Sequence, residues 1–198
     1  MHRRLGSLPR VAAAFLAIAG AAAPGRAQAP LTIEGRAGML APVDGFRRGP
    51  ERGGTLAPAL TFGVQLALER TQGRHLYVGF SQHRVDCTDD GCGRGGRYVA
   101  TSWDAGVRFD LGPVPWVPWV RLGLTVPKVE LDRPAPERGD VSALGIGVEG
   151  GAGLRVAVAD PFYLSPGVRF GAADADLPRG GVLRMRYLIL DVGVVLGF

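Results

Sequence analysis

The chain has 198 residues, with 23 Lys and Arg against 18 Asp and Glu, and a formal net charge of +5. Residues 1–29 hold four arginines and no acid, so residues 30–198 carry 19 positive and 18 negative groups. The basic excess therefore indicates no phosphate-binding surface, and we expect no nucleic-acid partner.

Residues 1–29 have the organisation of a cleaved secretory signal peptide. Arginines precede an apolar stretch of 13 residues, and a small-x-small pattern ends at Ala29. Thirteen residues are too few to cross a bilayer as a helix, which needs about 20. We expect cleavage after Ala29, or after Ala27 because Pro30 is unfavourable beside the first site. Residues 30–198 are then long enough for one domain.

The mature region contains eight stretches in which apolar residues alternate with polar residues or glycines. This period of two is the signature of β-strands. Each stretch holds the roughly 9–11 residues that a tilted strand needs to cross a bilayer. The stretches are 31–40, 60–69, 75–85, 99–111, 116–126, 143–158, 162–172 and 184–198.

The connections between these stretches alternate between long and short. Short turns at one end and long loops at the other are typical of an up-and-down barrel in an outer membrane. The sequence therefore predicts an all-β, eight-stranded, antiparallel, up-and-down transmembrane β-barrel at residues 30–198, with both termini in the periplasm. The long connections lie near 41–56, 86–97, 127–142 and 173–182, and the short ones near 70–74, 112–115 and 159–161.

Over the central part of every predicted strand, charges avoid the apolar side. An Arg or Lys that faces lipid at the bilayer midplane costs about 2–4 kcal/mol, so we expect these charges to face the lumen. A barrel in water would carry its apolar side inward instead. The predicted lumen charges are Glu34, Arg36, Glu69, Asp104, Arg108, Arg121, Glu149, Arg155, Arg169 and Asp191.

The last strand ends in one apolar face that finishes on a terminal aromatic, with Leu190, Val192, Val194, Leu196 and Phe198. This resembles the C-terminal signature of Gram-negative outer-membrane barrels, which the barrel-assembly machinery recognises. The mature chain resembles the OmpA/OmpX-like small eight-stranded barrels (outer membrane protein beta-barrel domain). The resemblance implies that Phe198 is an assembly signal and that the protein is a surface barrel of the outer membrane.

Two pairs of residues depart from the pattern. Pro118 and Pro166 fall inside strands, where each removes a ladder donor, so we expect bulges or early strand ends there. Arg184 and Arg186 share the outward side of the last strand. They would lie above the hydrocarbon near lipopolysaccharide phosphates, unless a bulge turns them inward.

Cys87 and Cys92 flank the sequence Thr-Asp-Asp-Gly in the second long loop. Two thiolates and two carboxylates would form a metal site, but an exported chain passes an oxidising compartment, which favours a disulfide. We therefore predict a disulfide that closes a small loop and contributes about 2 kcal/mol. We expect no metal and no cofactor.

The predicted lumen is narrow. Eight strands leave an interior just wide enough to be filled by side chains, and many inward glycines leave room for long charged ones. Because buried charges must be paired, we expect a lumen plugged by paired charges. A narrow porin-like channel for ions or small solutes is the alternative.

An enzyme that modifies lipid A is the second alternative. Ser81, His75 and His83 share the inward side of one strand, and Asp104 and Asp110 share that of the next. Such a site needs nucleophile, base and orienting group to converge. We interpret these residues as lumen side chains and expect no catalytic residue.

Aromatic residues gather on the outward side near the short turns, as in an interfacial girdle. We expect a monomeric, non-catalytic barrel with a structural or surface-interaction role, in contact with outer-membrane lipid and lipopolysaccharide. Basic loop residues would pair with lipopolysaccharide phosphates, but nearby acids favour ordinary solvated loops. The girdle residues are Phe109, Trp116 and Phe162, joined by Phe198.

Overall fold

The structure, a computed structural model, describes residues 31–43, 47–48, 57–86, 97–132, 141–176 and 182–197. Three predictions lie outside the described residues: the signal peptide at 1–29, the disulfide between Cys87 and Cys92, and the assembly signal at Phe198.

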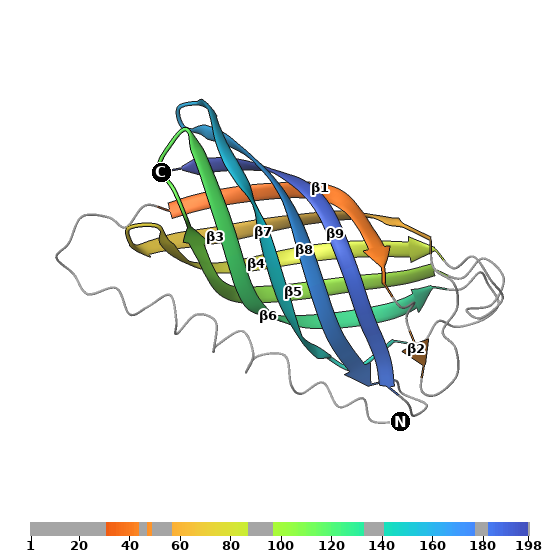
Figure 1. Ribbon diagram of the computed structural model, residues 1–198. Coiled ribbons are helices and arrows are strands. Elements are labelled where there is room, and N and C mark those ends of the chain that lie inside the picture. The colour runs from red at the N-terminus through yellow and green to blue at the C-terminus, as the bar shows by residue number, and fades with distance from the viewer. Residues whose placement is uncertain are drawn as a thin grey trace.

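Eight long strands form a closed antiparallel barrel (Figure 1). Each pairs with the next long strand in the chain, and pairing of the first with the last closes the sheet. This confirms the prediction of an all-β, eight-stranded barrel. The strands are β1 (Leu31–Pro42), β3 (Ala59–Thr71), β4 (Arg74–Asp86), β5 (Arg97–Asp110), β6 (Trp116–Asp132), β7 (Ile146–Ala159), β8 (Phe162–Asp176) and β9 (Val182–Gly197).

A ninth, two-residue strand, β2 (Arg47–Arg48), pairs with β9 at the end of the barrel where the long connections lie. The described part of the chain contains no helix long and apolar enough to cross a membrane.

The short turns gather at the other end of the barrel, where β1 begins and β9 ends (Figure 1). The tightest turn joins β3 to β4 at Gln72 and Gly73, and Gly73 has a φ of +73°, which glycine adopts without steric cost. The Glu69 carboxylate accepts a hydrogen bond of 2.8 Å from the Gly73 backbone nitrogen. Glu69, which we predicted to face the lumen, therefore closes a turn at the lumen's edge.

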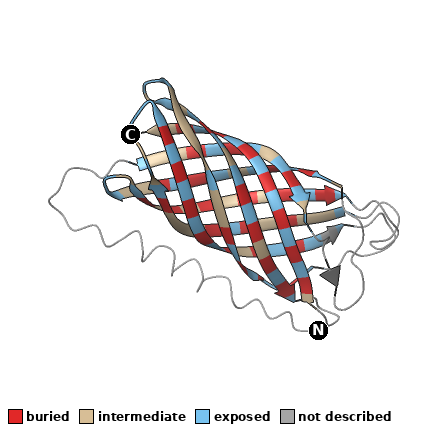
Figure 2. Ribbon diagram, viewed as in Figure 1, coloured by how far each residue is buried: buried red, intermediate tan, exposed pale blue. Residues whose placement is uncertain are grey.

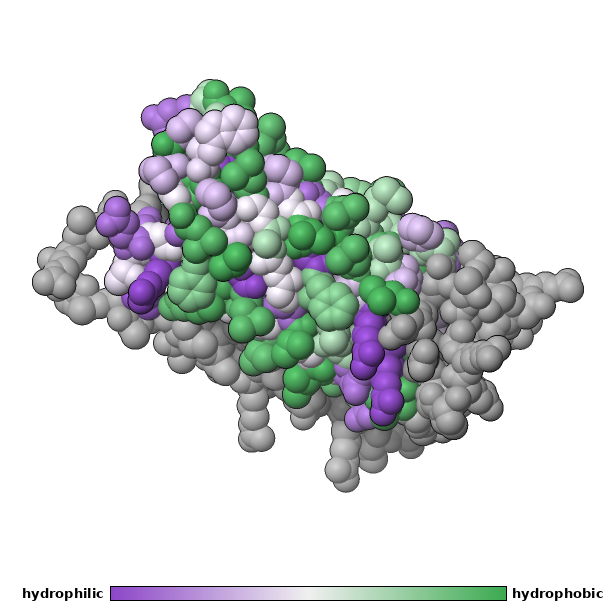
Figure 3. Space-filling view, viewed as in Figure 1, coloured by the Kyte–Doolittle hydropathy of each residue, from purple (hydrophilic) through white to green (hydrophobic). Residues whose placement is uncertain are grey.

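Burial alternates along most of the length of the long strands, and the second half of β7 is the main exception (Figure 2). Charged residues point inward and are buried, since Glu34 and Arg108 are each only 1% exposed. Large apolar residues point outward, and Leu122 is 63% exposed. Figure 3 shows hydrophobic side chains spread over the viewed face of the barrel. Soluble monomers rarely expose apolar patches larger than a few hundred Å², whereas a belt of outward apolar residues suits lipid.

Some strands run further toward the long loops than the alternation of apolar residues indicated. β6 continues to Asp132, past the predicted end at residue 126. Beyond that point the outward residues are Lys128 and Glu130, while Val129 points inward and is buried. The outward side thus becomes polar while the ladder to β5 continues.

Pro118 does not bulge or end its strand, so that expectation was wrong. It pairs with Leu154 in unbroken register. Its carbonyl accepts a hydrogen bond of 2.7 Å from the Leu111 backbone nitrogen, just past the end of β5. Because the N and O of a strand residue face the same neighbour, the proline nitrogen faces Leu111, one residue past the end of β5. The missing donor therefore removes only the second bond of this terminal pair and leaves the ladder between β5 and β6 intact.

Pro166 also lies within an unbroken strand and pairs with Val192 of β9. On its other side, the ladder between β7 and β8 skips two positions and then resumes in the same register. The missing donor is therefore accommodated by a gap in one ladder. The expected bulge at this position was wrong.

Candidate functional site

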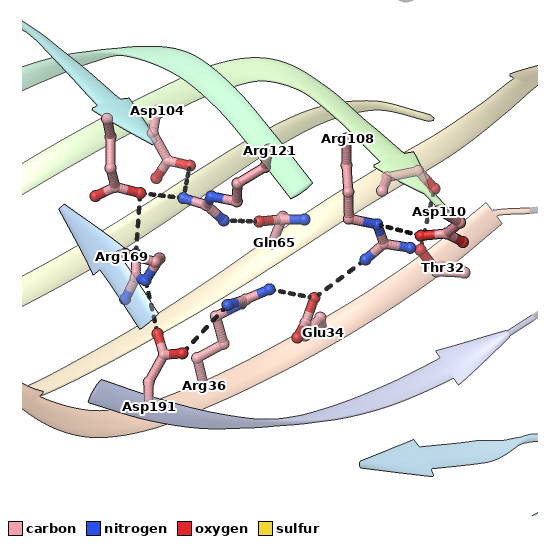
Figure 4. A network of polar contacts seen from close by, with 12 residues as sticks. Thr32, Glu34, Arg36, Gln65, Asp104, Arg108, Asp110, Arg121, Arg169 and Asp191 are labelled. Atoms are coloured by element: carbon pink, nitrogen blue, oxygen red, sulfur yellow. Dashed lines mark hydrogen bonds and ion pairs between the residues drawn. The ribbon is translucent and has the colours of Figure 1, made fainter. Parts of the chain in front are cut away.

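The middle of the lumen holds a chain of ten charged side chains in which acids and arginines alternate (Figure 4). Five carboxylates face five guanidinium groups, so the chain is balanced in charge. In order, its members are Asp104, Arg121, Glu149, Arg169, Asp191, Arg36, Glu34, Arg108, Asp110 and Arg155.

The first links run around the barrel wall from β5 to β8. Arg121 contacts Asp104 at 3.4 Å and forms an ion pair with Glu149. Glu149 lies opposite Gly123 on one neighbouring strand and opposite Gly171 on the other. The space over these glycines is filled by the Tyr77 hydroxyl and the Tyr187 ring, and the Tyr187 hydroxyl lies 3.5 Å from Glu149 Oε2.

The chain continues through β9 to β1. The Arg169 Nε donates to Asp191 Oδ2 at 2.6 Å, and Arg36 Nη1 lies 3.4 Å from Asp191 Oδ1. Arg36 Nη2 then lies 2.8 Å from Glu34 Oε2. Burying a charge is tolerated when it is paired. Glu149, Asp191 and Glu34 each contact two arginines.

The last links cross the lumen and meet at Asp110. Arg108 contacts Glu34 at 3.6 Å and Asp110 at 3.3 Å. Arg155 from β7 lies 2.5 Å from Asp110 Oδ2, and His75 Nε2 lies 3.0 Å from the same oxygen. Asp110 is thus the point at which three basic side chains converge near the short-turn end.

Three uncharged side chains support the arginines from strands that contribute no acid. The Gln65 Oε1 accepts a hydrogen bond of 2.5 Å from Arg121. The Tyr77 ring lies 4.7 Å from the Arg121 guanidinium carbon, and the Trp119 ring lies 5.3 Å from that of Arg36. Such cation–π contacts contribute about 2 kcal/mol when desolvated.

The lumen changes character toward the long loops, where buried apolar residues replace the charges. These residues lie on the inward sides of several strands and form one cluster against which Tyr98 packs. Its members are Leu40, Ala59, Val85, Ala100, Val129, Ala173, Ala175, Leu183, Met185, Tyr187 and Ile189.

Ser81 and His83 meet inside the barrel together with Thr61. Ser81 Oγ lies 3.3 Å from His83 Nε2, and Thr61 Oγ1 lies 2.7 Å from His83 Nδ1. A hydroxyl therefore occupies the place where a catalytic triad would have a carboxylate. His75, which lies on the same inward side of β4, contacts Asp110 instead.

Nine of the ten predicted lumen charges take part in the chain of ion pairs, and the tenth is Glu69 at the turn between β3 and β4. Asp110 was expected to point inward but was not among the predicted lumen charges, although it lies on the same side of β5 as Asp104 and Arg108. Phe109, Trp116 and Phe162 lie on the outward side beside the short turns and are exposed. In the described residues, no group of three or more His, Cys, Asp or Glu is placed to hold a metal ion.

Comparison with solved structures reveals close similarity of fold. Neisserial surface protein A aligns with a TM-score of 0.63 and 16% identity, over 88% of this chain and 99% of its own. The outer membrane protein OprG from Pseudomonas aeruginosa aligns with a TM-score of 0.58 and 10% identity, over 88% and 98%. The chain has the fold of the small eight-stranded outer-membrane barrels.

A third solved structure is also similar. A major outer membrane protein from Thermus thermophilus aligns with the barrel at a TM-score of 0.56 and 12% identity, over 87% of this chain and all of the other. The barrel's sequence matches no protein-family model and no curated protein.

Proposed function

We propose that this protein is a non-catalytic barrel of a bacterial outer membrane, exported through the periplasm, with a closed lumen and its long loops outside the cell. Its role is structural or one of surface interaction, and it works as a monomer. The belt of exposed apolar residues and the fold shared with outer-membrane proteins support the membrane placement. Lipopolysaccharide around the barrel, and the barrel-assembly machinery during biogenesis, are the proposed partners.

The filling of the lumen is the observation that carries this proposal. Two fillings lie in series along the barrel axis: the chain of ten charged residues, and the apolar cluster toward the loops. An ion would have to break several buried ion pairs and then pass apolar side chains such as Ile189, which is fully buried. Both steps are costly in a region of low dielectric constant.

Planar lipid bilayers test the closed lumen. We expect no discrete conductance steps after addition of the folded protein, whereas a porin treated identically conducts. Heat-modifiable mobility on unboiled gels tests the membrane barrel itself, because a folded outer-membrane barrel migrates differently before and after boiling. Recovery of the protein in the soluble periplasmic fraction would overturn the membrane placement.

A narrow channel is the second candidate function. It is favoured by a cavity of about 310 Å³ at the short-turn end, lined in part by His75, Arg155 and Tyr163. Arg155, which lines this cavity, is the last member of the chain of ion pairs and contacts Asp110. Steady conductance in the bilayer experiment would favour this function over the closed barrel.

The absence of catalysis is tested on Ser81 and His83. Both are buried, and the closed lumen separates them from substrate. We expect overexpression to leave the mass spectrum of lipid A unchanged, in the parent protein and in Ser81→Ala alike. A new lipid A species that disappears in Ser81→Ala would establish an enzyme.

A further inference from the structure

The cavity of about 310 Å³ at the short-turn end has polar walls and lies at the end of the lumen away from the apolar cluster. Its walls come from β1, β3, β4, β7, β8 and β9 and from the turn between β7 and β8. The side chains that give it polar or aromatic character are Thr32, Glu69, His75, Arg155, Asp160 and Tyr163.

Two carboxylates give this cavity negative charge. Glu69 and Asp160 lie outside the charge-balanced chain of ten residues, and neither forms an ion pair within the described part of the chain. Glu69 Oε1 accepts the hydrogen bond from the Gly73 backbone nitrogen, which leaves Oε2 for another donor. Asp160 is exposed in the turn that follows β7.

Arg155 is the one arginine of the wall, and its charge is already taken. Its Nη2 lies 2.5 Å from Asp110 Oδ2, and its guanidinium carbon lies 5.4 Å from the centre of the Tyr163 ring. Of its nitrogens, Nε is buried and has no hydrogen-bond partner among the described residues. The charge left over in the cavity is therefore that of the two carboxylates.

His75 adds a hydrogen-bond acceptor to the wall. It lies opposite Glu69 in the register between β3 and β4 and is only 4% exposed. Its Nε2 lies 3.0 Å from Asp110 Oδ2, and because a carboxylate only accepts, the neutral ring carries its proton on Nε2. Its Nδ1 is buried, has no hydrogen-bond partner in the described part of the chain, and then presents a lone pair.

We propose that this cavity binds the primary ammonium group of a small soluble amine. The groups it leaves available are mainly acceptors: the carboxylates of Glu69 and Asp160 and the Nδ1 of His75. An ammonium group has three donors and no acceptor, and charge-assisted hydrogen bonds to carboxylates are the strong ones. The inference goes beyond the proposed function and depends on it only for the compartment, the periplasm, from which the amine arrives.

A second cavity, of about 450 Å³, has room for the rest of the ligand. Glu69 and Arg155 line both cavities, so the two meet at these side chains. The second cavity is also lined by Gly112, Pro113 and Val114 of the turn between β5 and β6. These uncharged residues suit an aliphatic chain, and we expect butylamine to bind more tightly than methylamine.

The test titrates butylamine into the full mature barrel, isotope-labelled and folded in micelles of a zwitterionic detergent. Two backbone amides report on the site by nuclear magnetic resonance, that of Gly73 beside Glu69 and that of Gly197 in the cavity wall. We expect butylamine to shift both signals saturably. Tetramethylammonium has the same charge but no N–H donor, so it should bind at least about tenfold more weakly.

Three variants locate the binding site. Glu69→Gln keeps an oxygen for the Gly73 nitrogen but loses the charge, and should weaken butylamine binding about tenfold. Asp160→Asn removes an exposed carboxylate and should weaken it about threefold. Since it alters only an exposed turn residue, it decides the matter even if Glu69→Gln does not fold. Asp86→Asn, an exposed carboxylate near the long loops that is paired with Arg97, is the control and should leave the affinity unchanged.

Several results would overturn the inference. They are the absence of a saturable shift, equal affinity for butylamine and tetramethylammonium, or the same loss in Asp86→Asn as in Glu69→Gln. Displacement of butylamine by an equal concentration of calcium chloride would identify a metal site instead, and displacement by phosphatidylethanolamine added to the micelles would identify a lipid headgroup.

The inference and the proposed function fail separately. A barrel that binds no amine but shows heat-modifiable mobility and silent bilayers would leave the proposed function intact. Recovery of the protein in the soluble periplasmic fraction would overturn the membrane placement alone, because the titration in micelles does not depend on it.

Discussion

Arg108 on β5 reaches across the lumen to Glu34 on β1, with 3.6 Å between Nη1 and Oε2. The two strands are not neighbours in the sheet. This contact joins the ion pairs that follow the barrel wall to those around Asp110, and both side chains are almost completely buried.

Removal of the Glu34 charge should destabilise the barrel. In Glu34→Gln, Arg108 and Arg36 each lose one carboxylate partner inside the lumen. Breaking a buried pair costs about 3–5 kcal/mol, and because Asp110 and Asp191 remain as partners we expect a loss near 3 kcal/mol. Urea unfolding of the barrel in vesicles measures this change.

The exposed pair Arg97–Asp86 provides the control for that experiment. Arg97→Gln should change the free energy of unfolding by less than about 1 kcal/mol, because water screens an exposed pair.

Glu34→Leu combined with Arg108→Met should be less destabilising than the sum of the single changes. Additive losses would contradict a direct coupling between the two charges.

Gly167 should not tolerate a methyl group. A Cβ built there lies 2.7 Å from Cζ2 of the Trp119 indole, which is buried. Overpacking of this kind costs about 1–3 kcal/mol, so Gly167→Ala should lower the free energy of unfolding by that amount. Trp119→Phe, which shortens the ring, should restore part of the loss.

Gly35→Ala is the matched control for the Gly167 variant. Gly35 also lies within a strand, but a Cβ there meets no atom within 4 Å. Unfolding in urea should therefore be almost unchanged. Similar losses for both glycines would show that the backbone, and not the contact with Trp119, sets the cost.

Opening the lumen should require the removal of both fillings. Leu183→Ala with Ile189→Ala thins the apolar cluster, and Arg169→Ala with Asp191→Ala removes one neutral pair from the chain of charges. We expect each double variant to remain silent in planar bilayers and the fourfold variant to show conductance steps. Conductance in either double variant would mean that the filling left intact in that variant does not close the lumen by itself.

The disulfide between Cys87 and Cys92 remains a prediction from the sequence. The purified protein should react with a thiol reagent only after reduction, and then at two positions per chain. Loss of this small loop closure should cost no more than about 2 kcal/mol. Mass spectrometry after alkylation distinguishes the disulfide from two free thiols. Two alkylated cysteines without prior reduction would contradict the prediction.

The strands and their two sides follow from the sequence because both depend on local alternation. A side chain in a strand points opposite to its neighbours, so the alternation of Leu122 and Leu124 with Arg121 already separates outward from inward residues. The same local rule could not foresee that Pro118 and Pro166 lie in unbroken strands. The free-energy cost of a proline in a strand depends on whether the neighbouring strand has a carbonyl that needs the missing N–H at that position.

The sequence by itself determined a barrel with charges inside, and the tertiary structure decided which charges meet. Arg36 and Asp191 form an ion pair although 155 positions separate them in the chain. The contact between Glu34 and Arg108 depends on the width of the lumen, and the convergence on Asp110 depends on the stagger between β5 and β7. Only closure of the barrel fixes these distances, since it sets the register of all eight strands at once.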